Sequence, residues 1–328
     1  MRSKFRIALI GLIVSFVFIL AACSESSASD DTSGVTSNSG DQIRVGASNT
    51  STWVYGFMSS WAEVLQGENE ELNFVVQATA GSSAHYPMIE EGQLDMGSGF
   101  TPSEFYAARG EGGFDDEFSK FTAVMPNTTS VGHVFTTADS DIETVEDLNG
   151  VRIGLGARGS PTSIAAEVHV EALGIDAELI FTEPAELMNM MRDGRIDAIW
   201  YYAGGPWSNV LDLSSQVDLK FVSFTEEQIA TLQEAAPYTA STTIDSDMYN
   251  YVEEDVLTPA AVQTIIASED MDEDLVYEIT KTSWENWDKV VELVPAAGSV
   301  SIEDASSMVG KIHPGALRYY EEVGIEFD

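Results

Sequence analysis

Cysteine and basic side chains are the two resources in which this sequence is poorest. Its 328 residues include one cysteine, which excludes an internal disulfide framework, a cysteine zinc site and thioredoxin-type redox chemistry within one chain. Lysine and arginine number 15 against 54 aspartates and glutamates, a formal net charge of −39. A field of that sign repels nucleic acids, so we expect no nucleic-acid partner. The acidic residues are dispersed, which indicates a solvated surface and suits a saline, halophilic habitat.

Apolar material, by contrast, is ample. The chain is 44% hydrophobic and 21% charged, a balance typical of a protein that folds around packed cores. Once about 40 N-terminal residues are set aside, the remaining length predicts about two compact units.

The N-terminus reads as an export signal. Residues 1–23 hold three cations, then an apolar run over 7–20, then Ala21-Ala22-Cys23. The run is too short for a stable membrane-spanning helix and is followed by small residues, as in a secretory signal peptide. Its ending resembles the bacterial lipobox, in which the cysteine is diacylated and becomes the first residue. We therefore expect a lipoprotein anchored through Cys23 to the outer face of the cell membrane, the alternative being an ordinary signal peptide with a chance cysteine.

Residues 24–40 are rich in serine and carry two apolar side chains and no aromatic ring. Such a segment cannot bury enough surface to offset the entropy of ordering. We expect it to be a flexible tether.

The body alternates β-branched runs with amphipathic helical stretches, the pattern of an α/β protein with largely parallel sheets. The order strand, helix, strand, helix, turn, strand occurs twice. In the first unit the strands are predicted at 43–46, at 74–77 and just after 95, the helices at 55–65 and from Ser83, and the turn at 91–95. In the second unit the order is predicted at 151–154, 162–173, 178–181, 186–191, 193–197 and 198–201. Two matched units facing each other predict a cleft for a small ligand.

Extended segments are predicted to join the units. Residues 121–126 and 133–137 leave the first unit, and 258–267 return to it, so that two crossings form a hinge. Helices near 275–291 and from Pro314 are expected to pack back on the first lobe. The predicted lobes are 41–130 with 260–328, and 131–259.

Four stretches of the chain resemble the TAXI-type receptors of TRAP transporters. They are Gly46–Leu65, Gly81-Ser82-Ser83, Asp147–Thr162 with Asp193–Ala198, and His313-Pro314-Gly315-Ala316 with Tyr319, Tyr320 and Gly324. The chain departs from the family pattern at Thr52, Trp53, Arg158 and Pro161, and only Tyr55 of a tyrosine pair is present. These departures bear on the identity of the ligand.

The resemblance implies a bilobal, periplasmic-binding-protein-like fold of type II. It also implies TRAP membrane subunits as the partner. We therefore expect an extracytoplasmic receptor, monomeric and without a cofactor, that captures a small carboxylate-bearing solute between its lobes and delivers it to those subunits. An ABC-type bilobal receptor is the nearer alternative, and a secreted hydrolase is an alternative of another class.

Glycines open the predicted second-lobe site. Gly154-x-Gly156-x-x-Gly159 lies between a strand and a helix, which also spells a dinucleotide fingerprint. An export signal argues against a nicotinamide cofactor, but free N–H groups at a helix start hold an anion equally well. Ser160, Thr162 and Ser163 are therefore candidates for binding a carboxylate, the alternative being plain helix capping by Ser160. Arg158 is a candidate ion-pair partner of the ligand, or else a surface arginine.

The other candidates lie in loops after strands. Tyr201, Gly204 and Gly205 follow a strand and offer an aromatic face and close backbone approach, whereas Trp200 is expected in the core. On the first lobe the candidates are Ser48, Asn49, Thr50, Trp53, Tyr55, Ser82, Ser83 and Thr101.

Catalytic and metal signatures are absent from the sequence pattern. The four histidines, at 85, 133, 169 and 313, show no metal-ligand spacing. No nucleophile elbow with suitable partners is present, although Gly97-Ser98-Gly99 comes near. The sequence therefore predicts a binding protein and no enzyme or metal site.

Overall fold

The computed structural model of the chain describes residues 42–50 and 52–327, which belong to one compact unit, Ser37–Asp328. The expected signal peptide, the tether and the lipidation site at Cys23 lie outside the described residues. Within the described ranges, no helix combines the length and the apolar composition needed to span a bilayer.

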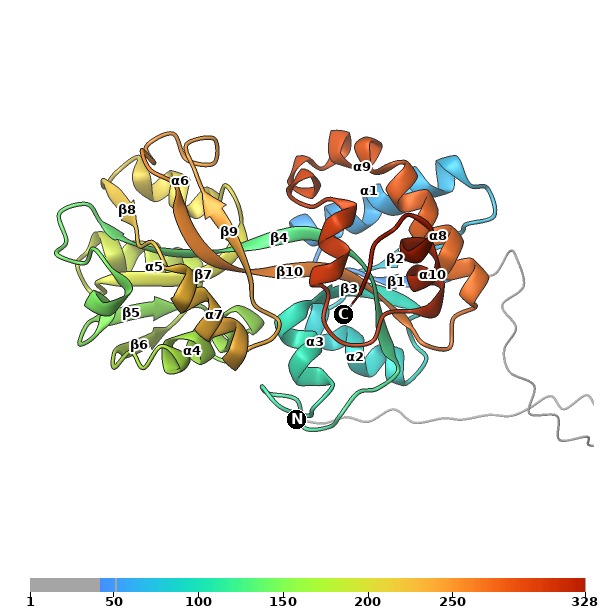
Figure 1. The fold of residues 1–328 in the computed structure, drawn as a ribbon, viewed down its shortest axis with the longest axis horizontal. Coiled ribbons are helices and arrows are strands. Elements are labelled where there is room, and N and C mark those ends of the chain that lie inside the picture. Colours follow the sequence, from blue (N-terminus) through green and yellow to red (C-terminus); the bar gives the residue numbers. More distant parts are fainter. Residues whose placement is uncertain (1–41, 51, 328) are drawn as a thin grey trace, which may run out of the picture. The chain divides into compact units, whose positions relative to one another are not determined.

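Ten strands form one sheet in the order β2-β1-β3-β10-β4-β7-β5-β6, with β8 paired to β4 and β9 to β10 (Figure 1). The strands are β1 (Ile43–Gly46), β2 (Phe74–Gln77), β3 (Met96–Phe100), β4 (Phe121–Thr137), β5 (Arg152–Leu155), β6 (Glu178–Phe181), β7 (Ala198–Gly204), β8 (Leu219–Phe221), β9 (Ala240–Ile244) and β10 (Val256–Ser268). The long strands β4 and β10 pair antiparallel and lie at the centre of this order. They confirm the two predicted crossings, with 121–126 and 133–137 joined into one strand.

The helices begin at recognisable caps. Thr52, Ser160, Thr225 and Asp272 each accept a backbone N–H in the first turn of the helix they precede. The helices are α1 (Trp53–Glu68), α2 (Ser82–Glu90), α3 (Thr101–Ala107), α4 (Pro161–Ala172), α5 (Pro184–Arg192), α6 (Ser208–Ser214), α7 (Glu226–Ala235), α8 (Glu273–Glu285), α9 (Trp287–Leu293) and α10 (Pro314–Glu322).

One helix prediction is wrong. A single helix was expected near 275–291, but the structure has α8 and α9, which end and begin at Asn286. Asn286 leaves the helical region at φ −123° and ψ 19°, and its side-chain amide donates to the Thr282 carbonyl. That bond competes with the helical ladder and breaks it locally.

The two lobes are built on the same plan. In the first, β1 lies between β2 and β3, both parallel to it, and β10 is antiparallel to β3. In the second, β5 lies between β6 and β7, both parallel to it, and β4 is antiparallel to β7. The antiparallel strand of the first lobe, β10, thus follows the second lobe in sequence. The antiparallel strand of the second lobe, β4, follows β1 to β3 of the first lobe.

The turn that the sequence repeats has the same structure in both lobes. Asp95 accepts the backbone N–H of Arg44 at 2.7 Å and its guanidinium Nε at 2.9 Å; Asp197 accepts the same groups of Arg152 at 2.8 and 2.9 Å. Each arginine also donates to the carbonyl of the turn glycine, Gly92 or Gly194. Both glycines adopt positive φ, +69° and +67°, which suits glycine because it has no Cβ.

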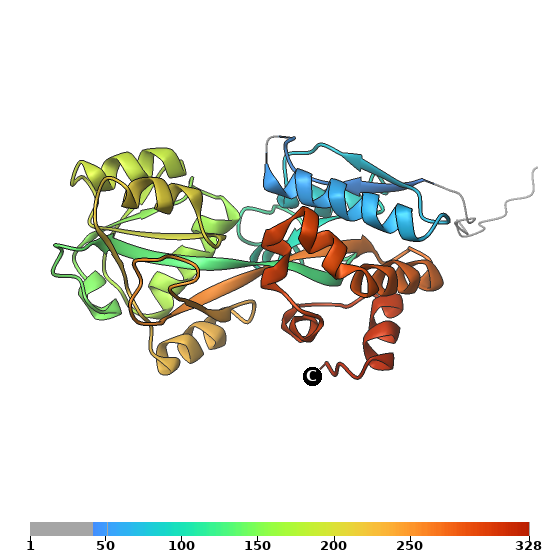
Figure 2. The same cartoon turned by 90° about the horizontal axis from the view of Figure 1, so that it is seen from above.

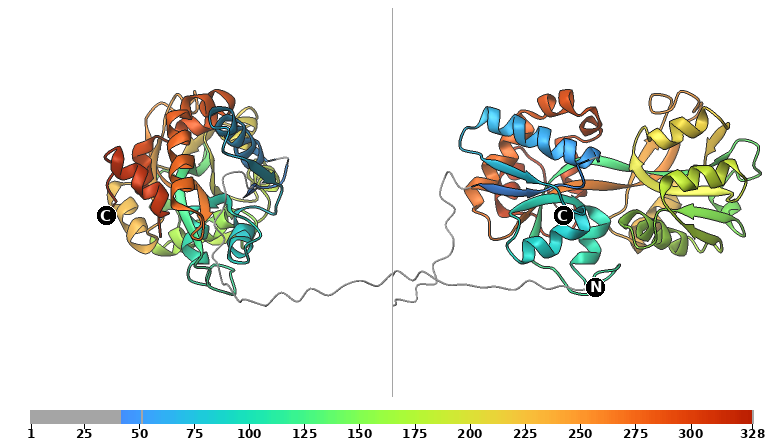
Figure 3. Two further views of the ribbon diagram at one scale, coloured as in Figure 1. Left: turned by 90° about the vertical axis from the view of Figure 1, so that its right-hand side faces the viewer. Right: turned by 180° about the vertical axis from the view of Figure 1, so that it is seen from behind.

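Helices cover both faces of each lobe. In the first lobe α1, α8, α9 and α10 enclose one core and α2 and α3 a smaller one, so that β1 and β2 lie between α1 and α2 (Figures 2 and 3). In the second lobe α4 and α7 contribute to one core and α5 and α6 to another. The α/β class with two lobes is confirmed. Helices α8 to α10 share a core with α1.

Candidate ligand-binding site

The first-lobe candidates gather where β1 and β2 end. Ser48, Asn49 and Thr50 follow β1, and Ser82 and Ser83 open α2. Gly81, at the N-cap of α2, has φ +110°, and a Cβ placed there would lie 3.6 Å from the Ser48 hydroxyl. The loop after β1 and the start of α2 are therefore neighbours.

The loop after β1 leads directly into α1. The Asn49 carbonyl accepts both the N–H and the hydroxyl of Thr52, and the Thr52 hydroxyl in turn accepts the N–H of Tyr55. Trp53, in the first turn, is 42% exposed and meets only one ring, Phe57, edge-on at 6.1 Å among the described residues. An aromatic face of that size, held on a helix start, is available for contact with a ligand.

The second-lobe candidates gather at the start of α4. Ser160 caps this helix, because its hydroxyl accepts the Ser163 N–H at 3.2 Å. This is the helix-capping role that the sequence offered as the alternative to ligand binding. A Cβ on Gly156 would lie 2.9 Å from the Thr162 hydroxyl, 3.1 Å from that of Ser160 and 3.0 Å from the Tyr201 ring. Glycine at 156 thus lets the loop after β5, the helix start and β7 converge. Ser163 is buried, and its hydroxyl donates to the Ala157 and Ser160 carbonyls.

Tyr201 forms the aromatic part of this group. Its ring stacks on Trp207 at 4.5 Å and 11°, and burial raises the pKa of its phenol above the ordinary value. Gly204 ends β7 beside Ser130 of β4, and Gly205 follows it. Trp200, the preceding aromatic of β7, is buried in the core as expected.

Arg158 stands in the loop between β5 and α4. Its side chain is exposed, and the guanidinium carbon lies 3.6 Å from the centre of the Phe181 ring. Within residues 42–50 and 52–327, no carboxylate is within ion-pair distance of it. The guanidinium is therefore oriented by a ring rather than by an ion pair. Burial raises the pKa of the Glu167 carboxyl and the charge of Arg158 opposes that shift, so this carboxylate lies within electrostatic reach of the guanidinium.

Thr101 has a different setting from the other candidates. It is buried at the start of α3, where its hydroxyl accepts the Val262 N–H at 3.1 Å and donates to the Tyr238 carbonyl at 3.4 Å. Tyr106 of the same helix meets the Tyr238 hydroxyl at 3.1 Å. Tyr238 lies between α7 and β9 of the second lobe, so these contacts join the lobes. A role for Thr101 in ligand contact stays a prediction.

The structure brings the candidates together as two groups. Ser48, Asn49, Thr50, Trp53, Tyr55, Ser82 and Ser83 lie on the first lobe, and Arg158, Ser160, Thr162, Ser163, Tyr201, Gly204 and Gly205 on the second.

Two residues near these groups were not selected from the sequence. Gln263 of β10 is half-buried, and its amide donates to the hydroxyl of Ser130 on β4 at 3.2 Å. His85 of α2 was considered only as a metal ligand, yet its imidazole contacts the loops after both β1 and β2. Room for the ring is made by Gly46 and Gly97, which pair between β1 and β3, and two glycines in neighbouring predicted strands were a usable signal.

Buried histidines elsewhere have structural partners. His169 lies between the Tyr202 hydroxyl at 2.6 Å and the Thr239 hydroxyl at 2.8 Å, and burial lowers its pKa to about 3. Burial likewise lowers the pKa of His133 to about 4. Among the described residues, no cluster of three or more His, Cys, Asp or Glu side chains could hold a metal ion.

Solved structures share this fold at low sequence identity. A TctC solute binding protein from Polaromonas, solved without ligand, has a TM-score of 0.57 at 14% identity, over 86% of this chain and 97% of that one. A protein from Xanthomonas citri bound to ATP has a TM-score of 0.50 at 10% identity, over 86% and 95%. A structure described for glutathione import via GshT and the cystine ABC importer TcyBC of Streptococcus mutans has a TM-score of 0.50 at 11% identity, over 81% and 99%.

The fold is therefore that of bilobal solute-binding proteins, and the likeness at these identities concerns the fold. A family-level match covers nearly all of the described chain: the model of the NMT1-like family matches residues 45–324. The chain belongs to the NMT1-like family.

Proposed function

We propose that this protein is an extracytoplasmic receptor that closes its two lobes around a small carboxylate-bearing solute and delivers it to the membrane subunits of a TRAP transporter. The observation that carries the proposal is the pairing of two matched lobes, each presenting polar side chains where its first strand ends. A ligand that touches both lobes favours their closed arrangement through its differential affinity.

The polar chemistry of the two loops supports a carboxylate. Hydroxyl groups stand at the starts of α1, α2 and α4, where helix dipoles favour negative charge. Arg158 adds a cation that forms no ion pair within contact distance among the described residues. Trp53 and Tyr201 add apolar faces for the rest of the solute.

Location and partner rest on the sequence. We propose that the mature protein is held at the outer membrane face through acylated Cys23 and acts as a monomer without a cofactor. The TAXI-type TRAP assignment rests on the motif resemblance, while family membership and fold agree with a solute receptor. An ABC-type permease is the alternative partner. The two are distinguished by testing which transporter, TRAP or ABC, requires this receptor for uptake of the solute.

We place the hinge where β4 and β10 pass from one lobe to the other. The proposed lobes are 41–130 with 260–328, and 131–259. A Cβ on Gly132 would lie 2.5 Å from the Pro259 carbonyl, so the two strands approach closely at this point. Both positions adjoin the proposed boundaries.

The decisive experiment is native mass spectrometry of the purified protein, followed by thermal shift with any carboxylate found. We expect one bound solute, a raised Tm with that solute, and no turnover of it. A chemical conversion of the solute would support the hydrolase alternative instead. An absence of any bound or stabilising carboxylate would contradict the proposal.

Trp53→Ala tests the aromatic contact. Because this side chain is 42% exposed, we expect the variant to fold normally but to bind the solute about tenfold more weakly, as measured by calorimetry. Leu293→Ala, at a 56% exposed position of α9, is the matched control and should bind as the unmodified protein does. Equal affinity of both variants would remove Trp53 from the site.

Arg158→Ala tests the charge contact. A hydrogen bond to a charged group contributes about 1.5–3 kcal/mol, so we expect affinity to fall about tenfold or more. Arg109→Ala is the matched control, because Arg109 also lies 3.6 Å above a ring, that of Phe105, and its loss changes the net charge equally. A loss below about twofold for Arg158→Ala would refute the ion pair.

A further inference from the structure

His85 is a fully buried imidazole in contact with both first-lobe loops. Its Nε2 lies 2.8 Å from the Ala47 carbonyl oxygen and 2.7 Å from the Thr79 hydroxyl, and its Nδ1 lies 2.7 Å from the Ser98 carbonyl oxygen. Ala47 directly precedes Ser48, and the Thr79 hydroxyl accepts the Gly81 N–H at 3.1 Å. The ring is thus one residue away from groups that the proposed function places against the solute.

The partners of His85 are matched to an imidazolium. Carbonyl oxygens only accept hydrogen bonds, and a neutral imidazole has one N–H, whereas the protonated ring has two. With a neutral ring, one nitrogen lone pair faces a carbonyl unless a hydroxyl turns to it. The Thr79 hydroxyl already donates to the Ala47 carbonyl, so it cannot serve both. The Ser98 hydroxyl lies 3.4 Å from Nδ1, farther than the Ser98 carbonyl oxygen at 2.7 Å, so it offers the weaker contact. The protonated ring satisfies Ala47, Ser98 and Thr79 together.

Opposing effects set the charge of the ring in the absence of ligand. Burial lowers the pKa of His85 below its ordinary value, and the hydrogen bonds to the Ser98 and Ala47 carbonyls raise it. A negative charge arriving nearby would shift this balance toward the cation.

The ionisable groups of the surrounding elements are engaged elsewhere. Arg44 of β1 pairs with Asp95, and Glu104 of α3 accepts from Thr264. On α2 itself, Tyr86 packs edge-on against Phe114, and Glu90 accepts the N–H groups of residues 119 and 120. The polar contacts of the His85 ring come from Ala47, Thr79 and Ser98, and Gly46 and Gly97 leave space for it; none of these residues is ionisable.

We propose that His85 takes up a proton when a carboxylate binds at the first-lobe loops, so that a buried imidazolium supplies the positive charge that these loops lack. The inference rests on the proposed function and assigns His85 as a positioning residue, since it acts through Ala47 and Thr79. It follows that the affinity for the carboxylate rises as the pH falls, by about threefold or more per pH unit near neutrality.

The test is ¹⁵N NMR of the protein labelled at its four histidines, titrated at pH 7.5 and constant ionic strength with acetate, succinate and L-glutamate. We expect one histidine, absent from the spectrum of His85→Asn, to change from neutral to cationic as a carboxylate saturates. Calorimetry in buffers of different ionisation enthalpy should show matching proton uptake, which His85→Asn loses while its Tm shows that it is folded. His133 is the internal control and should stay neutral.

The outcomes separate the inference from the function on which it rests. Saturable binding with every histidine unchanged, or with a histidine other than 85 gaining the proton, would overturn the inference and leave the receptor function standing. No saturable change with any of the three carboxylates would contradict carboxylate capture itself. Where His85→Asn does not fold, the wild-type spectra still decide whether a histidine gains a proton, and substitution of the other three histidines in turn identifies it by exclusion. Titration of Glu104 does not appear in these spectra.

Discussion

Replacing Glu104 by glutamine is expected to raise the free energy of unfolding by about 3 kcal/mol at pH 8 and to change it little at pH 4. Glu104 is 2% exposed on α3; one carboxyl oxygen accepts the Thr264 hydroxyl, and the other has no partner among the described residues. Burial raises its pKa from 4.5 to about 7. Its contribution to stability is therefore complete below pH 4.5 and is lost as the pH rises through 7, a loss that neutral glutamine avoids.

Urea unfolding at pH 4, 6 and 8 measures the difference between the variant and the unmodified protein. His133 and His169, held neutral by burial, make both proteins lose stability as the pH falls below 6.5, and this effect cancels in the difference. Glu117→Gln removes the same charge from an exposed position and should show no such pH dependence. A difference for Glu104→Gln that is equal at pH 4 and pH 8 would refute the buried carboxyl as the cause.

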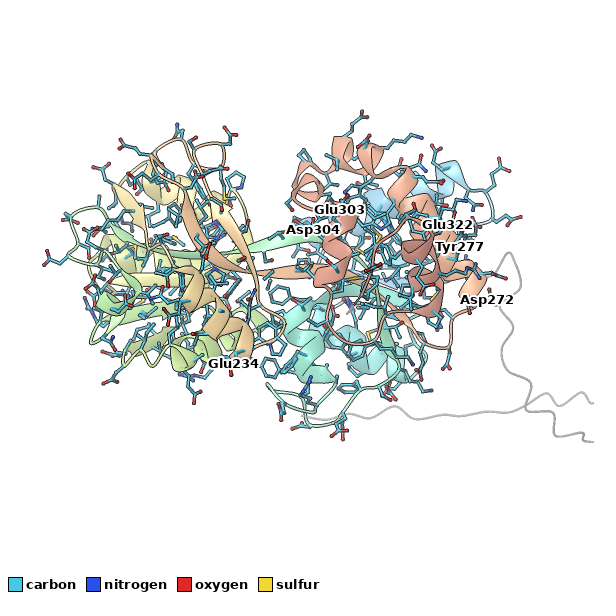
Figure 4. The ribbon with its side chains drawn as sticks, viewed as in Figure 1. Glu234, Asp272, Tyr277, Glu303, Asp304 and Glu322 are labelled. Carbon is cyan, nitrogen blue, oxygen red and sulfur yellow. The ribbon has the colours of Figure 1, made fainter. Side chains whose placement is uncertain are left out.

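Gly315→Ala is expected to destabilise the protein by about 3 kcal/mol. A Cβ at this position of α10 would overlap the Glu273 carbonyl oxygen of α8 and would lie 2.7 Å from the Tyr277 nitrogen. Both are backbone atoms, so no side-chain rotation relieves the overlap and the helices must separate. Their contact includes the Tyr277 hydroxyl, which donates to the Glu322 carboxylate at 2.6 Å (Figure 4).

The control for this prediction is Gly67→Ala. Gly67 lies in α1, and a Cβ there would meet nothing within 4 Å, so alanine should leave stability unchanged or raise it by up to about 1 kcal/mol. Chemical unfolding of both variants measures the contrast. Stability of Gly315→Ala within about 0.5 kcal/mol of the unmodified protein would show that α8 and α10 tolerate separation.

Local signals made most of the fold predictable. The repeated turn could be predicted because each copy needs a glycine at positive φ and an aspartate three residues later. In the structure each aspartate is paired with an arginine at the equivalent position, Arg44 or Arg152. The two crossing strands were legible from their β-branched runs. The break at Asn286 was not, because the sequence on both sides favours helix and the competing bond comes from one side chain.

The candidate site was predictable only in part, for the same physical reason. Ser160, Thr162 and Tyr201 were selected from strand ends and a helix start, features that a short stretch of sequence encodes. Thr101 shows what such a stretch hides: its hydroxyl is bonded to Tyr238, 137 residues away, across the two lobes. His85 could be noted in the sequence, but its contact with two loops could not be predicted, because only the assembled sheet brings those loops together.

The exchange of antiparallel strands between the lobes has a consequence for how the protein is made. Thr101 and Val262, which are hydrogen-bonded where β3 ends beside β10, are 161 residues apart in sequence. As the chain leaves the ribosome, β1 to β3 appear first but lack their fourth strand and three covering helices, whereas β4 to β7 follow one another without delay. Contacts close in sequence form sooner, so we expect the second lobe to be completed first. Until Ser268 has been synthesised, β3 lacks its partner β10, and we expect its free edge to be exposed to mispairing.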